Sequence, residues 1–315
     1  MHDNRWRRLG AAAVLSGGLG AVARWRRALT TSGALGALLT GTSIAGAGGW
    51  DWGGALVYFF VSSSALSRVA SRRKLAIAVD KFDKGSQRDL GQALANGGVA
   101  SVLALARATP WGRAHDAALE AAFAGALAAA TADTWATEVG TLSPWAPRLI
   151  TTGRCVAAGT SGGITPLGLV AAAAGAATLG LAFAVLSPGQ SPDAALITSH
   201  KFHAERGGRP LPRPFSREER GVRRRITTRG RRRLRAAALG GMAGALADSV
   251  LGATLQAMYR CPCCGVETER RQHRCGSSTV RVRGMPWVDN DVVNAACTLI
   301  GAAVGAIAGA LAGRQ

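Results

Sequence analysis

Three sequence patterns that would indicate other kinds of protein are missing: dispersed cysteines, a Walker A loop and a cleaved signal peptide. Only six cysteines occur among 315 residues, and four of them share one polar segment, which argues against the dispersed disulfide framework of secreted domains. The glycine-rich loop at 159–165 has no lysine where a Walker A phosphate loop needs one. Three N-terminal arginines precede an apolar stretch, but further apolar stretches follow. We therefore expect a retained first membrane anchor rather than a cleaved signal peptide.

Acidic residues are also scarce, since 18 Asp and Glu stand against 38 Lys and Arg, for a formal net charge of +20. Such a charge would suit nucleic-acid binding, but its distribution argues otherwise. The segment from Lys201 to Arg235 alone carries a net +11 and lies between apolar stretches. We expect a loop on the inner membrane face that contacts anionic lipid headgroups, and no nucleic-acid partner.

Small and apolar residues are abundant. The chain is 48% hydrophobic and contains 42 glycines, a composition that lets helices pack closely in lipid. A membrane span needs roughly 20 apolar residues. Candidate spans lie near 9–24, 29–48, 53–70, 90–107, 117–135, 163–187, 236–258 and 291–313. The expected fold is an all-α, polytopic transmembrane helix bundle of about six to eight spans.

Two N-terminal apolar helices at 1–50 precede the main membrane domain at 51–315, which contains a basic loop at 201–235 and a Cys-rich hairpin at 260–286. The positive-inside rule assigns both the basic connector at 71–88 and the basic loop to the cytoplasmic side, yet three candidate spans separate them. One candidate span must then be wrong. The segment around ATADTWATEVG is the best candidate, because a helix broken by Thr, Gly and Asp at membrane depth is tolerated where it lines a polar cavity.

Three carboxylates fall inside or beside apolar runs. Asp133 and Glu138 follow an Ala-rich stretch, and Asp248 lies within a later one. A charge at the bilayer centre costs about 2.5 to 3.5 kcal/mol on insertion scales, so these groups are expected to face a cavity, a cation or a partner. The alternative is a structural role, either capping a helix break or pairing with Arg148 or Arg154.

The two aspartates have similar surroundings. Asp133 and Asp248 each follow a Gly/Ala-rich helix and precede a hydroxyl residue. A duplicated half-site of this kind suits two helices that converge on one divalent cation, with Mg²⁺ preferred by oxygen ligands.

A glycine-rich loop and two polar helix starts add further candidates. Gly159, Thr160, Ser161, Gly162 and Gly163 precede an apolar helix, so their backbone could hold phosphate, although an ordinary helix cap is the simpler alternative. Other polar residues lie where helices are expected to begin. One set is Lys84, Arg88, Asp89, Gln92 and Asn96, of which Arg88, Gln92 and Asn96 are spaced four residues apart and are expected to lie along one helix face. The other set, Asp289, Asn290, Asp291 and Asn294, opens the last span, where capping accounts for Asp289.

The Cys-rich segment reads CPCCGVETERRQHRC. Cys261 and Cys264 form a CxxC pair, Cys275 follows, and either His273 or Cys263 is available as a fourth ligand. This set suits a tetrahedral, structural Zn²⁺ site. A disulfide or free thiols remain as alternatives.

These motifs occur in a recognisable order: KG-x-x-RD-x-GQ-x-LANGG, ADTWATEVG, P-R-x-ITTGR, GTSGGIT, DS-x-LGATLQ and DND-x-VN. The chain resembles the integral-membrane family catalogued as domain of unknown function 92. That family includes animal transmembrane protein 19 and a plant phytyl-phosphate kinase. The resemblance runs from about residue 50 to the C-terminus, and the basic insert is not part of the shared pattern.

The resemblance implies transfer of a phosphoryl group from CTP or ATP to a prenyl or phytyl monophosphate. Asp133 and Asp248 would bind Mg²⁺, with Glu138 as a further ligand or a base. The 159–163 loop would hold phosphate, Lys84, Arg88 and Arg154 would neutralise it, and Asn96, Asp291 and Asn294 would complete the cavity. The substrate would be a membrane isoprenoid phosphate. Apart from the resemblance, a short N-terminus without an Arg/Ser-rich transit peptide favours a bacterial cytoplasmic membrane.

Two other classes use similar residues. A secondary transporter or ion-coupled channel would place the same carboxylates on an ion path. A lipid-binding scaffold would not need them at all. Dependence on a nucleotide distinguishes the phosphotransferase from the transporter or channel. Tolerance of Asp133→Asn and Asp248→Asn would identify the lipid-binding scaffold.

Overall fold

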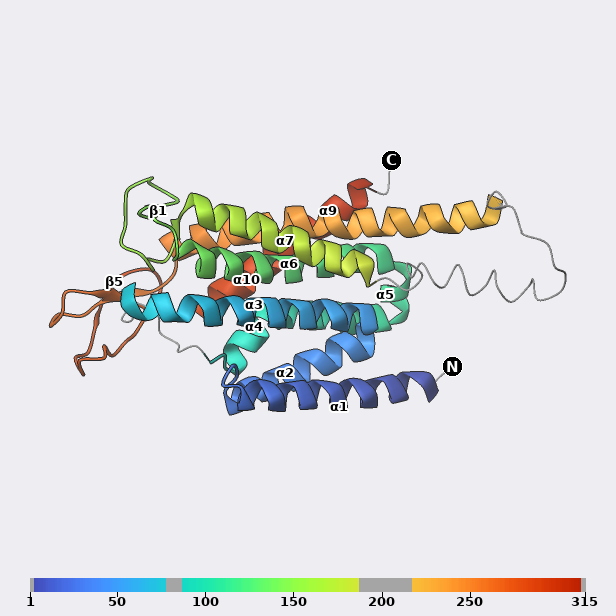
Figure 1. Ribbon diagram of the computed structural model, residues 1–315, viewed down its shortest axis with the longest axis horizontal. Helices are drawn as coiled ribbons and strands as arrows, with labels where there is room; N and C mark the ends of the chain where they lie inside the picture. Colours follow the sequence, from blue (N-terminus) through green and yellow to red (C-terminus); the bar gives the residue numbers. More distant parts are fainter. Residues whose placement is uncertain (1–2, 78–86, 187–216, 313–315) are drawn as a thin grey trace, which may run out of the picture.

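A computed structural model describes residues 3–77, 87–186 and 217–312, which form long helices and five short strands (Figure 1). The helices are α1 (Asp3–Trp25), α2 (Thr31–Ser43), the π-helical turn η1 (Ile44–Gly48), α3 (Trp50–Ile77), α4 (Leu90–Ala108), α5 (Pro110–Ala114), α6 (Asp116–Gly140), α7 (Pro166–Val185), α9 (Arg217–Thr254) and α10 (Asn290–Ala312). The longer helices run roughly along one direction, so that the bundle has two distinct ends.

Helix α6 lies at the centre of the bundle. Every residue from 119 to 132 is buried, because α3, α4, α7, α9 and α10 surround it. A helix covered on all sides must carry small side chains, which explains the Ala-rich sequence of this stretch. Its larger side chains join an aromatic cluster, in which Phe123 stacks on Trp52 at 4.0 Å and contacts Phe183.

Glycines set the distance between α6, α9 and α10. A Cβ atom at Gly240 would lie 2.6 Å from the Cα atom of Gly125, and one at Gly301 would lie 2.6 Å from the Cβ atom of Ala129. Gly244 contacts Ala129 in the same way. Helices α6 and α9 therefore match in steps of four residues, 125 with 240 and 129 with 244, and the next step pairs Asp133 with Asp248.

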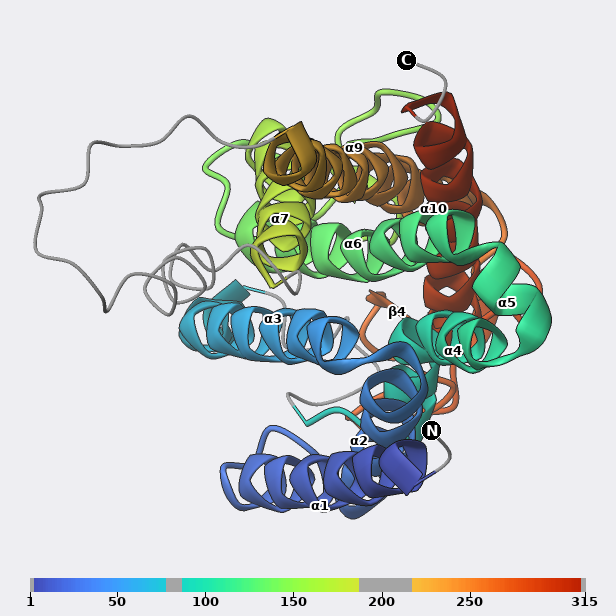
Figure 2. The same cartoon turned by 90° about the vertical axis from the view of Figure 1, so that its right-hand side faces the viewer.

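Helices α1 and α2 lie at the edge of the bundle (Figure 2). They attach through α2, which packs on α4, and through η1, which packs on α3 and α4. The turn between α1 and α2 also holds the residues before α4, since Thr30 N donates to Arg88 O at 3.0 Å and Arg88 N donates to Ala28 O at 3.1 Å. This pairing fixes the backbone of Arg88.

The strands gather at one end of the bundle, called here the sheet end (Figure 1). Strands β1 (Arg148–Leu149) and β2 (Gly163–Ile164) form an antiparallel pair between α6 and α7. Strands β3 (Met258–Arg260), β4 (Glu267–Thr268) and β5 (Val280–Arg283) form an antiparallel sheet in the order β4-β3-β5 between α9 and α10. The Cys-rich segment is thus three-stranded rather than a simple hairpin, because β5 returns along the free edge of β3.

Each of the eight apolar stretches lies mainly on a helix, and three helices of the described chain are long and apolar enough to cross a membrane: α7, the 228–254 part of α9, and α10 as far as Leu311. The span count of six to eight stays a prediction. The expected break in the helix at 130–140 was wrong, because α6 continues without interruption to Gly140. Its polar side chains from Asp133 onward are at least partly exposed near the end of the bundle, so the helix tolerates them without any break in the backbone.

The charge conflict is therefore not resolved by a broken span. Helix α4 starts at the sheet end and α9 starts at the opposite end, called here the far end (Figure 1). The basic segment at 201–235 was also predicted as a loop, yet from Arg217 onward it is part of α9. Residues 201–216 lie outside the described residues.

Exposed tryptophans occur at both ends of the bundle. Trp25, Trp145 and Trp287 lie at the sheet end, whereas Trp6, Trp50 and Trp111 lie near the far-end tips of their helices. Tryptophan prefers the two membrane–water interfaces, so this distribution is the one expected of a bundle that spans a bilayer.

Candidate functional site

A cavity of about 820 Å³ lies at the sheet end of the bundle. Its walls come from the last turns of α6 and α9, the first turns of α4, α7 and α10, the β1–β2 region, and the Cys-rich segment. Twelve of the predicted site residues line it: Arg88, Asn96, Asp133, Glu138, Gly159, Thr160, Ser161, Gly162, Gly163, Asp248, Asp291 and Asn294. Residues far apart in the sequence thus converge on one polar chamber.

Asp133 and Asp248 meet inside this chamber. Their side chains are in hydrogen-bond contact, and the Oδ2 atom of Asp248 is buried with no hydrogen-bond partner. Asp133 lies seven residues before the end of α6, or about 10 Å along the helix. Two carboxylates this close repel each other unless a proton or a cation lies between them. The pair is therefore suited to hold a cation near one end of the bundle rather than at its middle.

Glu138 lies one turn closer to the sheet end than Asp133. The Ser67 hydroxyl of α3 donates a hydrogen bond to its Oε1 atom at 2.8 Å. Arg88 faces the same carboxylate, and its guanidinium lies 5.6 Å from the ring centre of Phe59. Burial lowers the pKa of Arg88 from its usual value, and the charge of Glu138 opposes that shift. The pair places a positive and a negative group on one wall.

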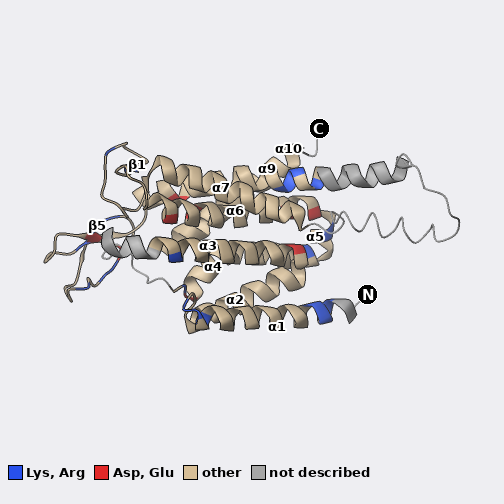
Figure 3. Ribbon diagram, in the orientation of Figure 1, with Lys and Arg blue, Asp and Glu red and all other residues tan. Residues whose placement is uncertain are grey.

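The described walls of the chamber carry an excess of negative charge. Among the residues that the structure describes, six carboxylates and three guanidinium groups line it: Asp133, Glu138, Asp248, Glu269, Asp289 and Asp291, against Arg88, Arg271 and Arg274. Figure 3 shows acidic residues on α6 close to this end. A surplus of carboxylate oxygens with several guanidinium groups suits a divalent cation together with an anionic group.

The glycine-rich loop borders the chamber in a different way from that predicted. It leads into β2, and α7 begins only at Pro166, where the Thr165 hydroxyl caps the helix by accepting from Gly168 N at 3.0 Å. Thr160 N and Gly163 N donate to carbonyls within the loop itself. The loop therefore presents fewer donors to an anion than a helix start would.

Close packing explains part of the glycine content of this loop. Gly162 has a φ of +81°, and a Cβ atom there would lie 2.5 Å from the Cβ atom of Ala253 in α9. Any side chain at this position would clash and be strained. The loop is thus fixed against the end of α9, beside the residues that follow Asp248.

The two polar helix starts have distinct roles. Asp89 and Gln92 form a capping box at the start of α4, so Arg88 precedes the helix rather than sharing a helical face with Gln92 and Asn96. All three still line the chamber. At α10, Asp289 Oδ1 accepts from Val292 N at 3.0 Å, which confirms the predicted capping role.

Two predicted phosphate ligands are not placed in the chamber. Arg154 lies in the exposed turn after β1 and does not line the cavity, and Lys84 falls outside the described residues. Arg148 donates to Gly153 O at 2.9 Å, so neither proposed arginine partner reaches Asp133 or Glu138. The β1–β2 turn holds both arginines away from the chamber.

The Cys-rich segment supplies residues that the sequence reading missed. Glu269, Arg271 and Arg274 line the chamber. Gln256, at the end of α9, donates to Glu269 Oε1 at 2.9 Å and accepts from the Ser161 hydroxyl. The alternation of acidic and basic residues with cysteines in ETERRQHRC was the available signal, but spacing alone could not show that this segment folds back onto α9.

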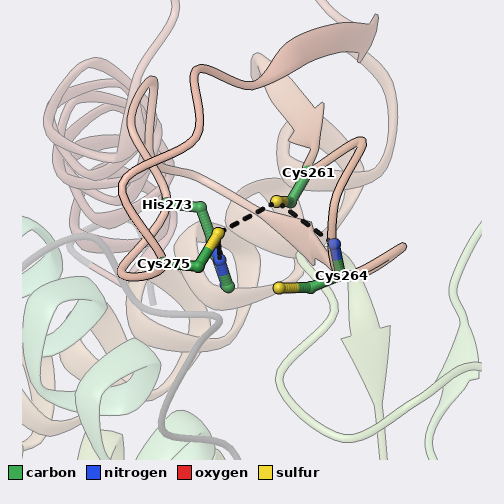
Figure 4. A group of neighbouring side chains, drawn as sticks. All are labelled: Cys261, Cys264, His273 and Cys275. Carbon is green, nitrogen blue, oxygen red and sulfur yellow. Dashed lines mark hydrogen bonds between the residues drawn. The ribbon is translucent and has the colours of Figure 1, made fainter.

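Cys261, Cys264, His273 and Cys275 form a compact group beside the chamber (Figure 4). Their ligand atoms all lie within 4.8 Å of one another. The Sγ atoms of Cys261 and Cys275 are 3.6 Å apart, and His273 Nδ1 lies 3.2 Å from Cys275 Sγ. The hydrogen bond with His273 lowers the pKa of the Cys275 thiol to about 5. Of the two candidates for a fourth ligand, the fold brings His273 rather than Cys263 into the group.

A second charged cluster lies at the far end of the bundle, on α3, α6 and α9. Glu120 accepts from Arg229 Nε at 2.9 Å and from Arg232 Nη2 at 2.8 Å, and it also contacts Arg233. Arg233 is fully buried and bridges Glu120 to Asp51. These three arginines belong to the segment predicted to contact lipid headgroups, but they bind carboxylates of the chain itself.

Comparison with known proteins agrees with this architecture. The model of the family described as integral membrane protein DUF92 matches residues 14–302, which include every residue that lines the chamber. Protein PGR of Arabidopsis thaliana is 32% identical over 279 residues, covering 85% of each chain. An uncharacterised membrane protein of Methanocaldococcus jannaschii is 33% identical over 155 residues, 49% of this chain and 61% of that one. No solved structure matches. The chain therefore belongs to the integral membrane protein family DUF92.

Proposed function

We propose that this protein is a Mg²⁺-dependent phosphotransferase that moves a phosphoryl group from CTP or ATP to an isoprenoid monophosphate. The observation that carries the proposal is the contact of Asp133 with Asp248 in a chamber that also holds three arginines. Phosphoryl transfer depends mainly on positioning and on neutralising negative charge. Carboxylates that hold a divalent cation, with guanidinium groups nearby, supply both.

The donor set fits Mg²⁺. This cation prefers oxygen ligands and is usually held by one or two carboxylates plus substrate phosphates. Asp133 and Asp248 would hold it, since Asp248 Oδ2 is buried without a hydrogen-bond partner, and Glu138 is within the same chamber. When bound, the cation would neutralise charge that develops on the transferred phosphoryl group.

The remaining walls suit the other parts of the reaction. Arg88, Arg271 and Arg274 would bind phosphate oxygens, and Glu138, held by Ser67, would position or deprotonate the attacking phosphate. Leu169, Met242 and Leu246 give the chamber an apolar wall, and Leu246 is partly exposed on the outer surface of α9. That wall would accept the first carbons of a lipid tail, which favours an isoprenoid substrate over a soluble one.

The test is transfer of label from the γ-phosphate of CTP or ATP to geranylgeranyl or phytyl monophosphate by purified protein in detergent. We expect Mg²⁺-dependent diphosphate product that disappears in Asp133→Asn. The control is Glu267→Gln, which removes an exposed carboxylate of β4 that pairs with Arg260.

Absence of product across several prenyl chain lengths, with protein that unfolds cooperatively, would reject the kinase. In that case the same protein is reconstituted in liposomes. Cation or proton flux that Asp133→Asn abolishes would then identify the carboxylate pair as part of a transport path.

A further inference from the structure

The Cys-rich segment combines a group of metal-ligand side chains with one wall of the chamber. We propose that Cys261, Cys264, His273 and Cys275 bind one Zn²⁺ ion, and that this ion holds Arg271 and Arg274 at the chamber. The zinc site stands on its own geometry. Only the role of the two arginines toward phosphate rests on the proposed function.

The spacing of the ligand atoms fits a tetrahedral metal site. Zn–S bonds are about 2.3 Å long, so two tetrahedral thiolate ligands lie about 3.8 Å apart. The Sγ atoms of Cys261 and Cys275 are separated by 3.6 Å, and no described cysteine is in a disulfide. Three sulfurs and one imidazole are a common ligand set of structural zinc.

Two of the four side chains, Cys261 and His273, are buried polar groups, which also points to a ligand. His273 is buried, and its Nε2 atom has no hydrogen-bond partner, while its Nδ1 atom faces the sulfur of Cys275. Cys261 is completely buried, and its sulfur accepts from Cys264 N at 3.4 Å. Backbone N–H donation to a ligating sulfur is the kind of outer contact that orients metal ligands.

The fold around the group needs a stabilising element. Strands β3, β4 and β5 have only three, two and four residues, and most side chains between Pro262 and Val282 are at least partly exposed. Segments of this size rarely bury enough apolar surface to hold one structure without a metal or a disulfide. A zinc ion would link β3, through Cys261, to the loop before β5, through Cys275.

The same loop carries the arginines. Arg271 and Arg274 lie on either side of His273, and Arg274 directly precedes Cys275. Coordination of a metal by His273 and Cys275 would therefore hold the backbone of both arginines in place. Thr279 Oγ1 donates to Arg271 O at 2.8 Å, and Arg271 Nη2 donates to Pro286 O at 3.1 Å. Loss of the metal would release this loop, and with it two of the three guanidinium groups of the chamber.

The experiment measures metal content in protein purified under reducing conditions without chelators. We expect about one zinc per chain in the wild type and in Cys263→Ser, and loss of zinc in Cys264→Ser and Cys275→Ser. Cys263 is the matched control, because it is exposed and adjacent to a ligand but outside the group. Loss of zinc from an unfolded serine variant would be uninformative, so Co²⁺ is also exchanged into the wild type, where visible bands of a tetrahedral thiolate site are expected. His273→Cys should keep the metal and shift those bands.

Limited trypsin digestion tests the link to the arginines. Removal of zinc by a chelator should speed cleavage after Arg271 and Arg274 at least several-fold without changing cleavage outside the Cys-rich segment at 260–286. A wild type that holds no zinc and takes up no Co²⁺, or a Cys261–Cys275 disulfide found by mass spectrometry, would overturn the proposal. So would zinc that survives in Cys264→Ser and Cys275→Ser but is lost in Asp133→Asn. None of these readouts requires phosphotransferase activity, so failure of the proposed function would leave them intact.

Discussion

The two ends of the bundle treat buried charge in opposite ways. At the far end, Glu120 accepts from three arginines, and Arg233 bridges it to Asp51, so both carboxylates are paired with guanidinium groups. At the sheet end, six carboxylates and three arginines of the described residues share a chamber, so the carboxylates outnumber their possible partners. Paired buried charges hold a fold together, whereas an excess of one charge leaves groups available to bind a ligand. The comparison predicts that the far end serves stability and the sheet end serves function.

Removing Glu120 should give the largest effect. Glu120→Ala leaves Arg233 buried with one carboxylate partner fewer, and breaking a buried pair costs about 3 to 5 kcal/mol. We expect a large drop in the midpoint of thermal unfolding in detergent. Glu267→Ala is the control, since the exposed pair with Arg260 is worth only about 0 to 1 kcal/mol. Equal stability of the two variants would contradict the prediction that the charged cluster of the far end stabilises the fold.

Neutralising Asp248 should lower activity rather than stability. Asp248→Asn removes negative charge from the chamber and should lower product formation at least about 100-fold, a loss typical of removing one group that stabilises a transition state. Its unfolding midpoint should be unchanged or higher, because repulsion with Asp133 is relieved. A variant that loses stability and activity together would mean that the pair is structural.

Filling the contact between α6 and α9 should disturb both ends. In Gly240→Ala, the new methyl group would lie 2.6 Å from the Cα atom of Gly125. Overpacking of this kind costs about 1 to 3 kcal/mol and would separate the helices that bring Asp133 to Asp248. Both the unfolding midpoint and the Mg²⁺ dependence of activity should change. Gly10→Ala is the control, because that Cβ position is open.

Two arginines of the sheet end, one lining the chamber and one outside it, test which residues bind the phosphate of the substrate. Arg271→Ala removes a guanidinium that lines the chamber and should raise the KM for the phosphate substrate about tenfold, the value of one charged hydrogen bond. Arg154→Ala removes an exposed arginine outside the chamber and should leave the kinetics unchanged. Steady-state kinetics of the two variants side by side decides between them. An equal rise in KM in both variants would mean that Arg154 binds phosphate, as the sequence predicted.

Much of the site could be read from single positions in the sequence. Asp133, Glu138 and Asp248 stood out because carboxylates are costly within apolar stretches, and the capping role of Asp289 followed from its place before a helix. The contributions of Arg271, Arg274 and Glu269 could not be read, because they depend on how β3, β4 and β5 fold back over the end of α9. The break expected near 131–140 failed for a related reason. The polar side chains of this stretch line the chamber at the end of a continuous helix, and no local pattern records that other segments close a polar chamber around them.

The sequence by itself determined that this is a helical membrane protein, because apolar stretches of about 20 residues must form helices in a bilayer. It also determined which residues are expensive to bury. Only the tertiary structure decided which of them meet. Matched glycines bring α6 and α9 close enough for Asp133 to contact Asp248. The far-end arginines, which the sequence predicted to lie in a lipid-facing loop, are paired with carboxylates inside the bundle. The physical reason is that the energy of a charge depends on its neighbours in space, and in a bundle of long helices those neighbours come from distant parts of the chain.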